Sequence, residues 1–143
     1  MAPRKLFAFA LEPEVLLLDE PFSNLDAALR GSVRQQVRTI IQRAGASAVF
    51  VTHDQDEAFG LADRVAVMRQ GHIEQTGNAA EIYQHPANRF VAGFVGDATF
   101  LPGRVDGGEL RTELGAVPLA AAGLADGALV DVMVRPESVD LAA

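Results

Sequence analysis

The sequence predicts an α/β protein with a parallel sheet, followed by a small all-β segment. Two β-rich runs, at residues 15–18 and 48–52, flank a long amphipathic stretch, the order expected of parallel strands joined by a helix. The composition changes around residues 96–97. From there, glycine and proline recur every few residues between short β-like runs. The 143 residues, 49% of them hydrophobic, suffice for one domain or two small ones. We therefore expect two domains, at 1–96 and 97–143.

The first half of the chain has the order strand, helix, strand, helix. Residues 15–18 are Val-Leu-Leu-Leu, a continuous aliphatic run typical of a strand buried on both faces. Asp26 can cap a long helix with one apolar stripe, which Gly45 can end. Residues 48–52 are β-rich and predict the second strand, and residues 55–62 predict a short second helix.

A hairpin and two short helices are expected next. Gln70-Gly71 is a turn between two β-like runs, and Asn78 with Glu81 three residues later forms a capping-box pattern. The expected elements are strands at 64–69 and 72–75, helices at 79–83 and 90–95, and, clearest among the later runs, a strand at 129–134. Near the start, residues 6–11 (Leu-Phe-Ala-Phe-Ala-Leu) suit either a strand or a helix.

Composition excludes several classes of protein. Twelve basic against 19 acidic residues give a net charge of −7, and the basic residues are scattered, so we expect no nucleic-acid partner. The chain has no cysteine and three isolated histidines, which excludes disulfides and a zinc cluster. No apolar run reaches the roughly 18 to 20 residues that span a bilayer, and no signal peptide is evident. We expect a cytoplasmic protein without direct membrane insertion.

Acidic residues follow the first strand and a histidine follows the second. Asp19 and Glu20 are adjacent carboxylates, so one can hold Mg²⁺ while the other polarises an attacking water. His53 would lie at the same edge of a parallel sheet, where it could contact a terminal phosphate. The alternatives are a polar turn at Asp19-Glu20-Pro21 and a histidine with a surface role.

Several motifs together resemble one family. Residues 16–26 (LLLDEPFSNLD) resemble the Walker B motif and D-loop of the ABC transporter ATPases, and residues 51–58 (VTHDQDEA) resemble their H-loop. Residues 61–68 (LADRVAVM) continue the resemblance to the importer ATPases for sugars, polyamines, sulfate and ferric iron. Residues 100–105 (FLPGRV) look like the junction to the C-terminal TOBE domain, and residues 135–138 resemble its Arg-Pro-Glu step.

The resemblance implies a function and a site. It implies an ATP-hydrolysing importer subunit, with Asp19 as the Mg²⁺ carboxylate, Glu20 as the catalytic base and His53 as the γ-phosphate contact. Ser23 to Asp26 would face a second ATPase subunit across ATP, and the homodimer would bind membrane permease subunits at the inner face of the cell membrane. The junction string is most similar to the ferric-iron and polyamine branch, so ferric iron is the preferred solute.

Other family motifs are missing from these 143 residues. They contain no Gly-x-x-x-x-Gly-Lys-Ser/Thr phosphate loop (Walker A), no glutamine loop and no Leu-Ser-Gly-Gly-Gln signature. We therefore expect an incomplete P-loop NTPase core followed by a partial OB-like TOBE domain, the C-terminal part of a longer ATPase that binds ATP poorly alone. A vacant sheet position could be covered by residues 6–11 of the same chain or of a second copy, which favours a homodimer.

Two other functions remain open. The chain could be a non-catalytic interaction or regulatory module that retains the TOBE-like segment, and ATP binding by the isolated chain separates this from an enzyme. An unrelated Mg²⁺-dependent ATPase is disfavoured, because the D-loop-like and H-loop-like strings occur in order and in register.

Overall fold

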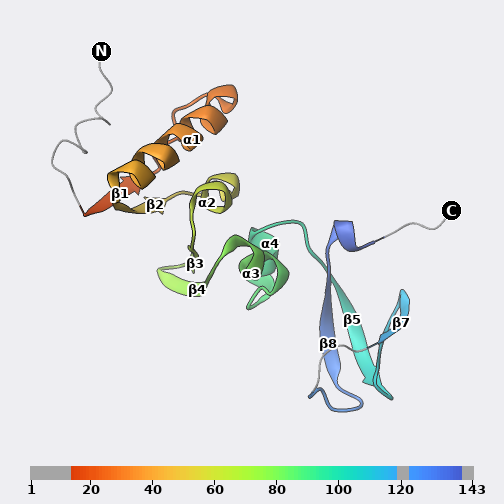
Figure 1. The fold of residues 1–143 in the computed structure, drawn as a ribbon. Coiled ribbons are helices and arrows are strands. Elements are labelled where there is room, and N and C mark those ends of the chain that lie inside the picture. The colour runs from red at the N-terminus through yellow and green to blue at the C-terminus, as the bar shows by residue number, and fades with distance from the viewer. Residues whose placement is uncertain (1–13, 119–122, 140–143) are drawn as a thin grey trace. The chain divides into compact units, whose positions relative to one another are not determined.

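A computed structural model describes residues 14–118 and 123–139, which form two compact units (Figure 1). One unit ends at His85 and the other begins at Pro86. The apolar run at residues 6–11 lies outside the described residues. Within the described part of the chain, no helix is both long and apolar enough to cross a membrane.

The N-terminal unit alternates strands and helices before a hairpin. Its elements are β1 (Val15–Asp19), α1 (Ala27–Ala44), β2 (Ser47–Val51), α2 (Gln55–Leu61), β3 (Val65–Arg69), β4 (His72–Gly77) and α3 (Ala79–Gln84). The expected order of elements is confirmed, and most boundaries fall within one or two residues of those expected.

Strands β1 and β2 pair in parallel, as the sequence predicts. Leu17 lies beside Val49 and Asp19 beside Val51, so both strands end at one edge of the sheet. The expectation that residues 15–18 are buried on both faces is wrong: Leu16 is 5% exposed, but Leu17 is 78% exposed. Among the described residues this sheet has only two strands and only one of its faces is covered. Burial depends on such covering elements, which the strand's own composition does not reveal.

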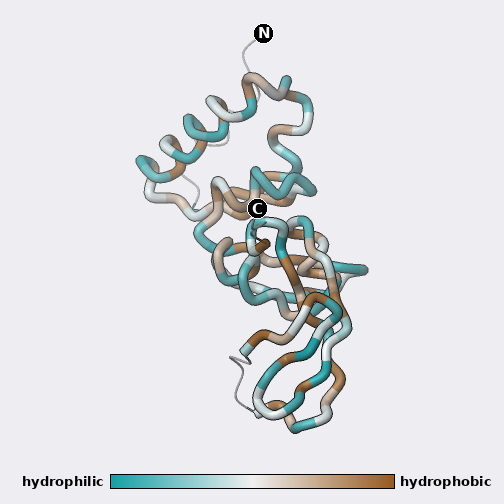
Figure 2. Tube along the Cα trace, turned by 90° about the vertical axis from the view of Figure 1, so that its right-hand side faces the viewer, coloured by the Kyte–Doolittle hydropathy of each residue, from teal (hydrophilic) through white to brown (hydrophobic). Residues whose placement is uncertain are grey.

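Helix α1 has the predicted ends, but only part of its apolar stripe is buried. Gly45 ends the helix with a φ of 62°, a left-handed conformation that glycine adopts without steric cost. Asp26 occupies the N-cap position without a capping hydrogen bond from its side chain. Figure 2 shows that much of the tube of α1 is hydrophilic, with apolar residues recurring along it. Ile41 is the buried member of that apolar stripe, whereas Leu29 and Ile40 are exposed.

The hairpin and α3 are fixed by local sequence signals. Gln70 and Gly71 both have positive φ, at 49° and 81°, the turn geometry whose twist matches that of paired strands. The capping box is confirmed: the Asn78 side chain accepts a hydrogen bond from the Glu81 amide, and the Glu81 carboxylate accepts one from the Asn78 amide. Ile82, in the helix that this box starts, is fully buried.

In its described residues, the C-terminal unit combines one α-helix and a short 3-10 helix with an antiparallel sheet. Its elements are α4 (Arg89–Phe94), β5 (Thr99–Asp106), β6 (Glu109–Thr112), β7 (Gly115–Pro118), β8 (Leu129–Val134) and the short 3-10 helix η2 (Pro136–Ser138). The strand order is β7-β6-β5-β8. The strand expected at 129–134 is confirmed.

A buried arginine ties α4 to this sheet. Arg135, 5% exposed, donates from Nη1 to the carbonyl oxygens of Ala92, at 3.1 Å, and Asp97, at 3.0 Å. These bonds explain why α4 clusters with the C-terminal unit, although it precedes the domain boundary expected at 96–97. Domains at 1–96 and 97–143 stay a prediction.

Candidate functional site

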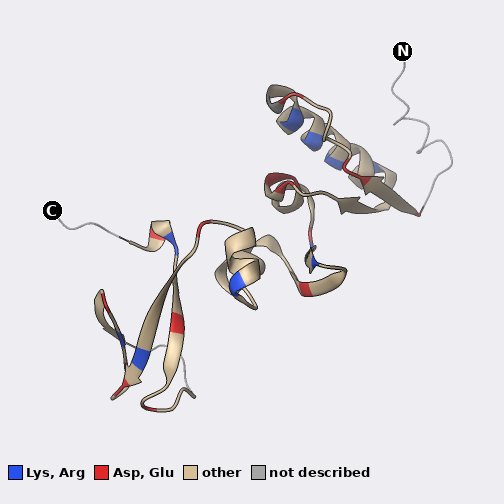
Figure 3. Cartoon of the chain, turned by 180° about the vertical axis from the view of Figure 1, so that it is seen from behind, with Lys and Arg blue, Asp and Glu red and all other residues tan. Residues whose placement is uncertain are grey.

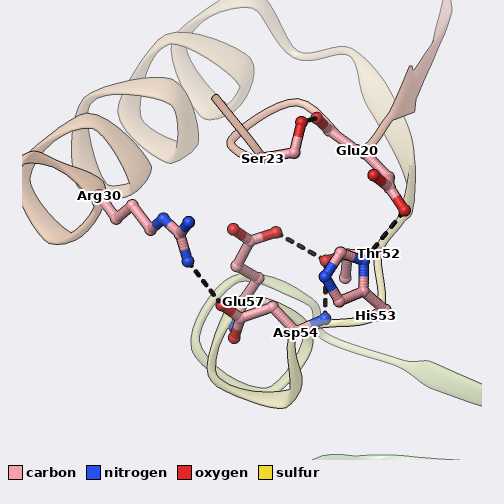
Figure 4. Close-up of a pocket in the computed structure, with 7 residues that line it drawn as sticks. All are labelled: Glu20, Ser23, Arg30, Thr52, His53, Asp54 and Glu57. Carbon is pink, nitrogen blue, oxygen red and sulfur yellow. Dashed lines mark hydrogen bonds and ion pairs between the residues drawn. The ribbon is translucent and has the colours of Figure 1, made fainter. Parts of the chain in front are cut away.

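The strand ends of the N-terminal unit bring a carboxylate and a histidine into contact. Glu20 directly follows β1, and His53 lies two residues beyond β2. The His53 Nδ1 atom lies 3.0 Å from Glu20 Oε1, as Figure 4 shows. The side chains of His53 and Glu20 are 77% and 49% exposed, respectively. Water can therefore reach both groups, and a single hydrogen bond joins them.

Glu20 lies in a strained turn that hydrogen bonds and an aromatic contact hold in place. Its φ of 41° lies in the left-handed region, which costs a residue with a β-carbon about 1–2 kcal/mol. The Glu20 amide donates to the Val51 carbonyl at 2.7 Å, and the Glu20 carbonyl accepts from the hydroxyl of Ser23 at 3.0 Å. Phe22, 1% exposed, stacks against Phe50 on β2. These contacts hold the turn in place after the strand has ended.

A hydrogen-bond chain surrounds the backbone of His53. The Asp54 amide donates to Thr52 Oγ1 at 3.0 Å, and that hydroxyl donates to Glu57 Oε2 at 2.7 Å. Asp54 Oδ1 in turn caps α2 by accepting from the Glu57 amide at 3.1 Å. Glu57 is only 4% exposed, so its carboxylate is a buried acceptor satisfied by the Thr52 hydroxyl. Both neighbours of His53 are thereby fixed.

Arg30 on α1 connects the two loops. Its Nε donates to the Leu25 carbonyl at 2.9 Å, and its Nη1 lies 3.5 Å from Asp54 Oδ2. Figure 3 shows basic residues spaced along α1 and an acidic start to α2. Arg30 therefore contacts the N-cap residue of α2.

These residues line a small pocket. It is lined by Glu20, Ser23, Arg30, Thr52, His53, Asp54 and Glu57, and its volume is about 50 Å³. Pockets that enclose a whole organic ligand measure about 300–1,000 Å³. The described pocket is therefore too small to enclose a nucleotide, which would have to extend outside it.

Three of the five site residues expected from the sequence meet here. Glu20, Ser23 and His53 line the pocket, whereas Asp19 and Asp26 do not. Asp19 ends β1 on the face shared with Leu17, and its side chain is exposed. Asp26 is exposed at the start of α1.

Sequence reasoning gave no role to the remaining pocket residues. These are Arg30, Thr52, Asp54 and Glu57. A signal for two of them was present, because Asp54 followed three residues later by Glu57 is a capping pattern before a helix. Arg30 carried no such signal, because its contact with Asp54 crosses 24 residues of sequence.

The residues present fit a magnesium ion only in part. Mg²⁺ commonly binds through one or two carboxylates together with water and substrate phosphates. Asp19 offers an exposed carboxylate of this kind. Among residues 14–118 and 123–139, no group of three or more histidine or acidic side chains is placed to hold a metal ion. A bound phosphate would thus have to supply part of the ligand shell.

Comparison with known proteins gives close relatives over most of the chain. The sulfate/thiosulfate import ATP-binding protein CysA 2 of Chromobacterium violaceum is 48% identical over 132 residues, which are 92% of this chain and 36% of that protein. The Fe(3+) ions import ATP-binding protein FbpC 1 of Rhodococcus jostii is 49% identical over 134 residues, 94% of this chain and 38% of that protein. No protein-family model matches the chain.

A further relative extends the same pattern. The Fe(3+) ions import ATP-binding protein FbpC of Rhizobium etli is 46% identical over 140 residues, 95% of this chain and 40% of that protein. The chain thus spans less than half the length of each of these relatives. Nearly all of its own length is similar to part of an import ATP-binding protein.

Proposed function

We propose that this chain is part of the ATP-binding subunit of an ABC-type importer, in which ATP hydrolysis drives solute uptake. The observation that carries the proposal is the contact between Glu20, after β1, and His53, after β2. These residues belong to the segments that resemble Walker B and the H-loop, and they meet at the edge of a parallel sheet where such sites form. Relatives at 46–49% identity, all named as import ATP-binding proteins, support it.

Glu20 is the proposed general base. Its half-exposed carboxylate can accept a proton from a water that attacks the terminal phosphate. Asp19, the preceding residue, is the proposed Mg²⁺ carboxylate. When bound, the ion supplies positive charge to the phosphate oxygens.

His53 is the proposed γ-phosphate contact, and its bond to Glu20 constrains how it can act. A carboxylate only accepts hydrogen bonds, so Nδ1 carries a proton when it is bound to Glu20. In a neutral imidazole the other nitrogen, Nε2, is then an acceptor and cannot donate to a phosphate oxygen. His53 must therefore gain a second proton, or release Glu20, when it binds phosphate.

The remaining assignments follow from the same resemblance. Residues 1–96 are the proposed C-terminal part of the ATPase domain, and residues 97–143 are a partial OB-like TOBE domain. Ser23 and Asp26 are proposed to face a second ATPase subunit. The subunit would act in the cytoplasm, docked on membrane permease subunits.

A non-catalytic interaction or regulatory module is the second candidate. Two observations favour it for the chain alone: the pocket measures about 50 Å³, and the 143 residues contain no phosphate-loop string. In this role the C-terminal unit would supply the contact surface.

Two solute classes fit the relatives. We prefer ferric iron, because residues 100–105 resemble the junction in that branch. Sulfate or thiosulfate is the alternative, since the relatives named above include import proteins for both. Uptake of labelled iron against labelled sulfate separates the two.

The function is tested with a joined protein, defined here as this chain fused behind the preceding segment of the Rhodococcus jostii relative. In the joined protein, His53→Ala is expected to lower ATP turnover at least about tenfold through loss of a phosphate contact. His72→Ala, which removes an exposed histidine outside the pocket, should leave turnover unchanged. If the joined protein binds ATP and hydrolyses it at the same rate with and without His53, the proposed γ-phosphate contact of His53 is refuted.

Assembly is tested on the chain as it stands. One face of the β1–β2 sheet is apolar and exposed. It is formed by Val15, Leu17, Val49 and Val51, which as whole residues are 54%, 78%, 51% and 58% exposed. Exposed strand edges and apolar faces recruit further chains, so we expect a homodimer in light scattering at micromolar concentration. Leu17→Lys, which places a charge on that face, should shift the mass towards the monomer. A folded monomer for the unmodified chain would contradict the proposal.

A further inference from the structure

Arg30 joins three segments of the N-terminal unit through one guanidinium group. The residue lies on α1, its Nε donates to Leu25 in the loop after β1, and its Nη1 pairs with Asp54 in the loop after β2. The side chains of Arg30 and Asp54 are only 33% and 25% exposed, so this contact is better shielded from solvent than a surface ion pair.

The loops that Arg30 joins carry the two groups of the proposed site. The side chain of His53 is largely exposed and that of Glu20 is half-exposed, and they share one hydrogen bond, so side-chain packing does little to hold them. His53 lies between Thr52 and Asp54, which are bonded to each other. Holding Asp54 therefore fixes the backbone on either side of His53, and holding Leu25 limits movement of the turn that follows Glu20.

We infer that Arg30 is a positioning residue that keeps the Glu20 loop and the His53 loop in register. The kinetic consequence of this inference rests on the proposed function, whereas its structural consequence does not. Both contacts require a planar group with donors that point in different directions. A lysine ammonium at position 30 is a single point of charge, so it would lose part of the connection.

Arg38 provides a matched control on the same helix. It lies two turns further along α1 and binds the far end of α2, with Nη1 donating to Gly60 at 3.3 Å and Nη2 lying 3.7 Å from Asp63. Arg38 thus also contacts a backbone carbonyl and a carboxylate, at the other end of α2, but its carboxylate partner is 96% exposed and it does not line the pocket. A general effect of weaker contact between α1 and α2 should appear in both arginine variants.

The structural consequence is tested on the 143-residue chain by amide hydrogen exchange. In Arg30→Ala, exchange of the Glu57 amide, which is bonded to Asp54, should accelerate about tenfold, because a charge-assisted contact that holds its acceptor is lost. In Arg38→Ala the same amide should exchange as in the unmodified chain. Unchanged exchange in Arg30→Ala, or equal acceleration in both variants, would overturn the inference.

A second variant covers the case in which Arg30→Ala does not fold. Arg30→Lys keeps the positive charge and the long aliphatic stem but loses the two-directional donors. We expect acceleration at the Glu57 amide that is smaller than tenfold but measurable. Exchange equal to that of the unmodified chain would show that a positive charge at position 30 suffices. It would mean that the planar guanidinium, with donors in two directions, is not needed to hold the loops.

The kinetic consequence is tested in the joined protein. Because Arg30 acts through the loops, Arg30→Ala should lower kcat about tenfold and leave KM for ATP within about twofold. Arg38→Ala should change neither. A raised KM with unchanged kcat would mean that Arg30 binds the phosphate directly, which would overturn the positioning role. A joined protein with no ATPase activity would refute the proposed function instead, and the exchange experiment would still decide the inference.

Discussion

Glu20→Gln in the joined protein is expected to lower ATP turnover by about a thousandfold, within the 10²- to 10⁴-fold range typical of a lost general base. Glutamine has nearly the shape of glutamate but cannot accept a proton from water at neutral pH. The position is suitable for this role, because Glu20 follows the strand directly and its carboxylate is half-exposed beside His53. The measurement is steady-state phosphate release with saturating ATP and Mg²⁺.

Two controls separate loss of the base from loss of the fold. ATP affinity of the Glu20→Gln protein should stay within about threefold of wild type, since a base contributes to turnover and little to ground-state binding. Glu113→Gln, which changes an exposed carboxylate of the C-terminal unit, should leave turnover unchanged. Turnover of Glu20→Gln within about threefold of wild type would exclude Glu20 as the base.

The isolated 143-residue chain is expected to bind ATP at least about a thousandfold more weakly than the joined protein. A phosphate loop contributes several backbone N–H donors and a lysine, and the loss of only three charge-assisted bonds at about 1.5–3 kcal/mol each accounts for that factor. The pocket of about 50 Å³ points the same way, because it is too small to enclose a nucleotide.

Calorimetric titration with ATP and Mg²⁺ measures this difference directly. The joined protein is the positive control and should bind under the same conditions. A dissociation constant below about 10 μM for the isolated chain, a binding free energy of about −7 kcal/mol, would contradict the prediction. It would also favour a self-sufficient nucleotide site over the regulatory alternative.

Features set by neighbouring residues could be predicted from the sequence. The Asn78–Glu81 capping box depends on a four-residue pattern, and the Gln70-Gly71 turn depends on two flanking strands and the freedom of glycine. The parallel pairing of β1 with β2 was also predictable, since a helix of suitable length connects them. That pairing places Glu20 and His53 at one edge of the sheet.

Features set by distant parts of the chain could not be predicted. Helical periodicity places Arg30 off the apolar stripe of α1, but it does not say whether that side meets water or another helix. The aliphatic run of β1 similarly shows that Leu17 can be buried, while its 78% exposure depends on what covers the sheet. In the same way, a glutamate in the first turn of a helix is usually exposed. Glu57 is buried because of its tertiary surroundings, where its carboxylate accepts a hydrogen bond from Thr52.

The left-handed backbone of Glu20 implies a conflict between heat resistance and activity. Glycine at this position would remove the steric penalty at φ 41°, and asparagine tolerates that region better than glutamate does. Directed evolution that selects only for thermal tolerance would therefore favour replacement of the residue that the proposed chemistry cannot lose. Glutamate would be retained at position 20 only if the selection also required ATP turnover.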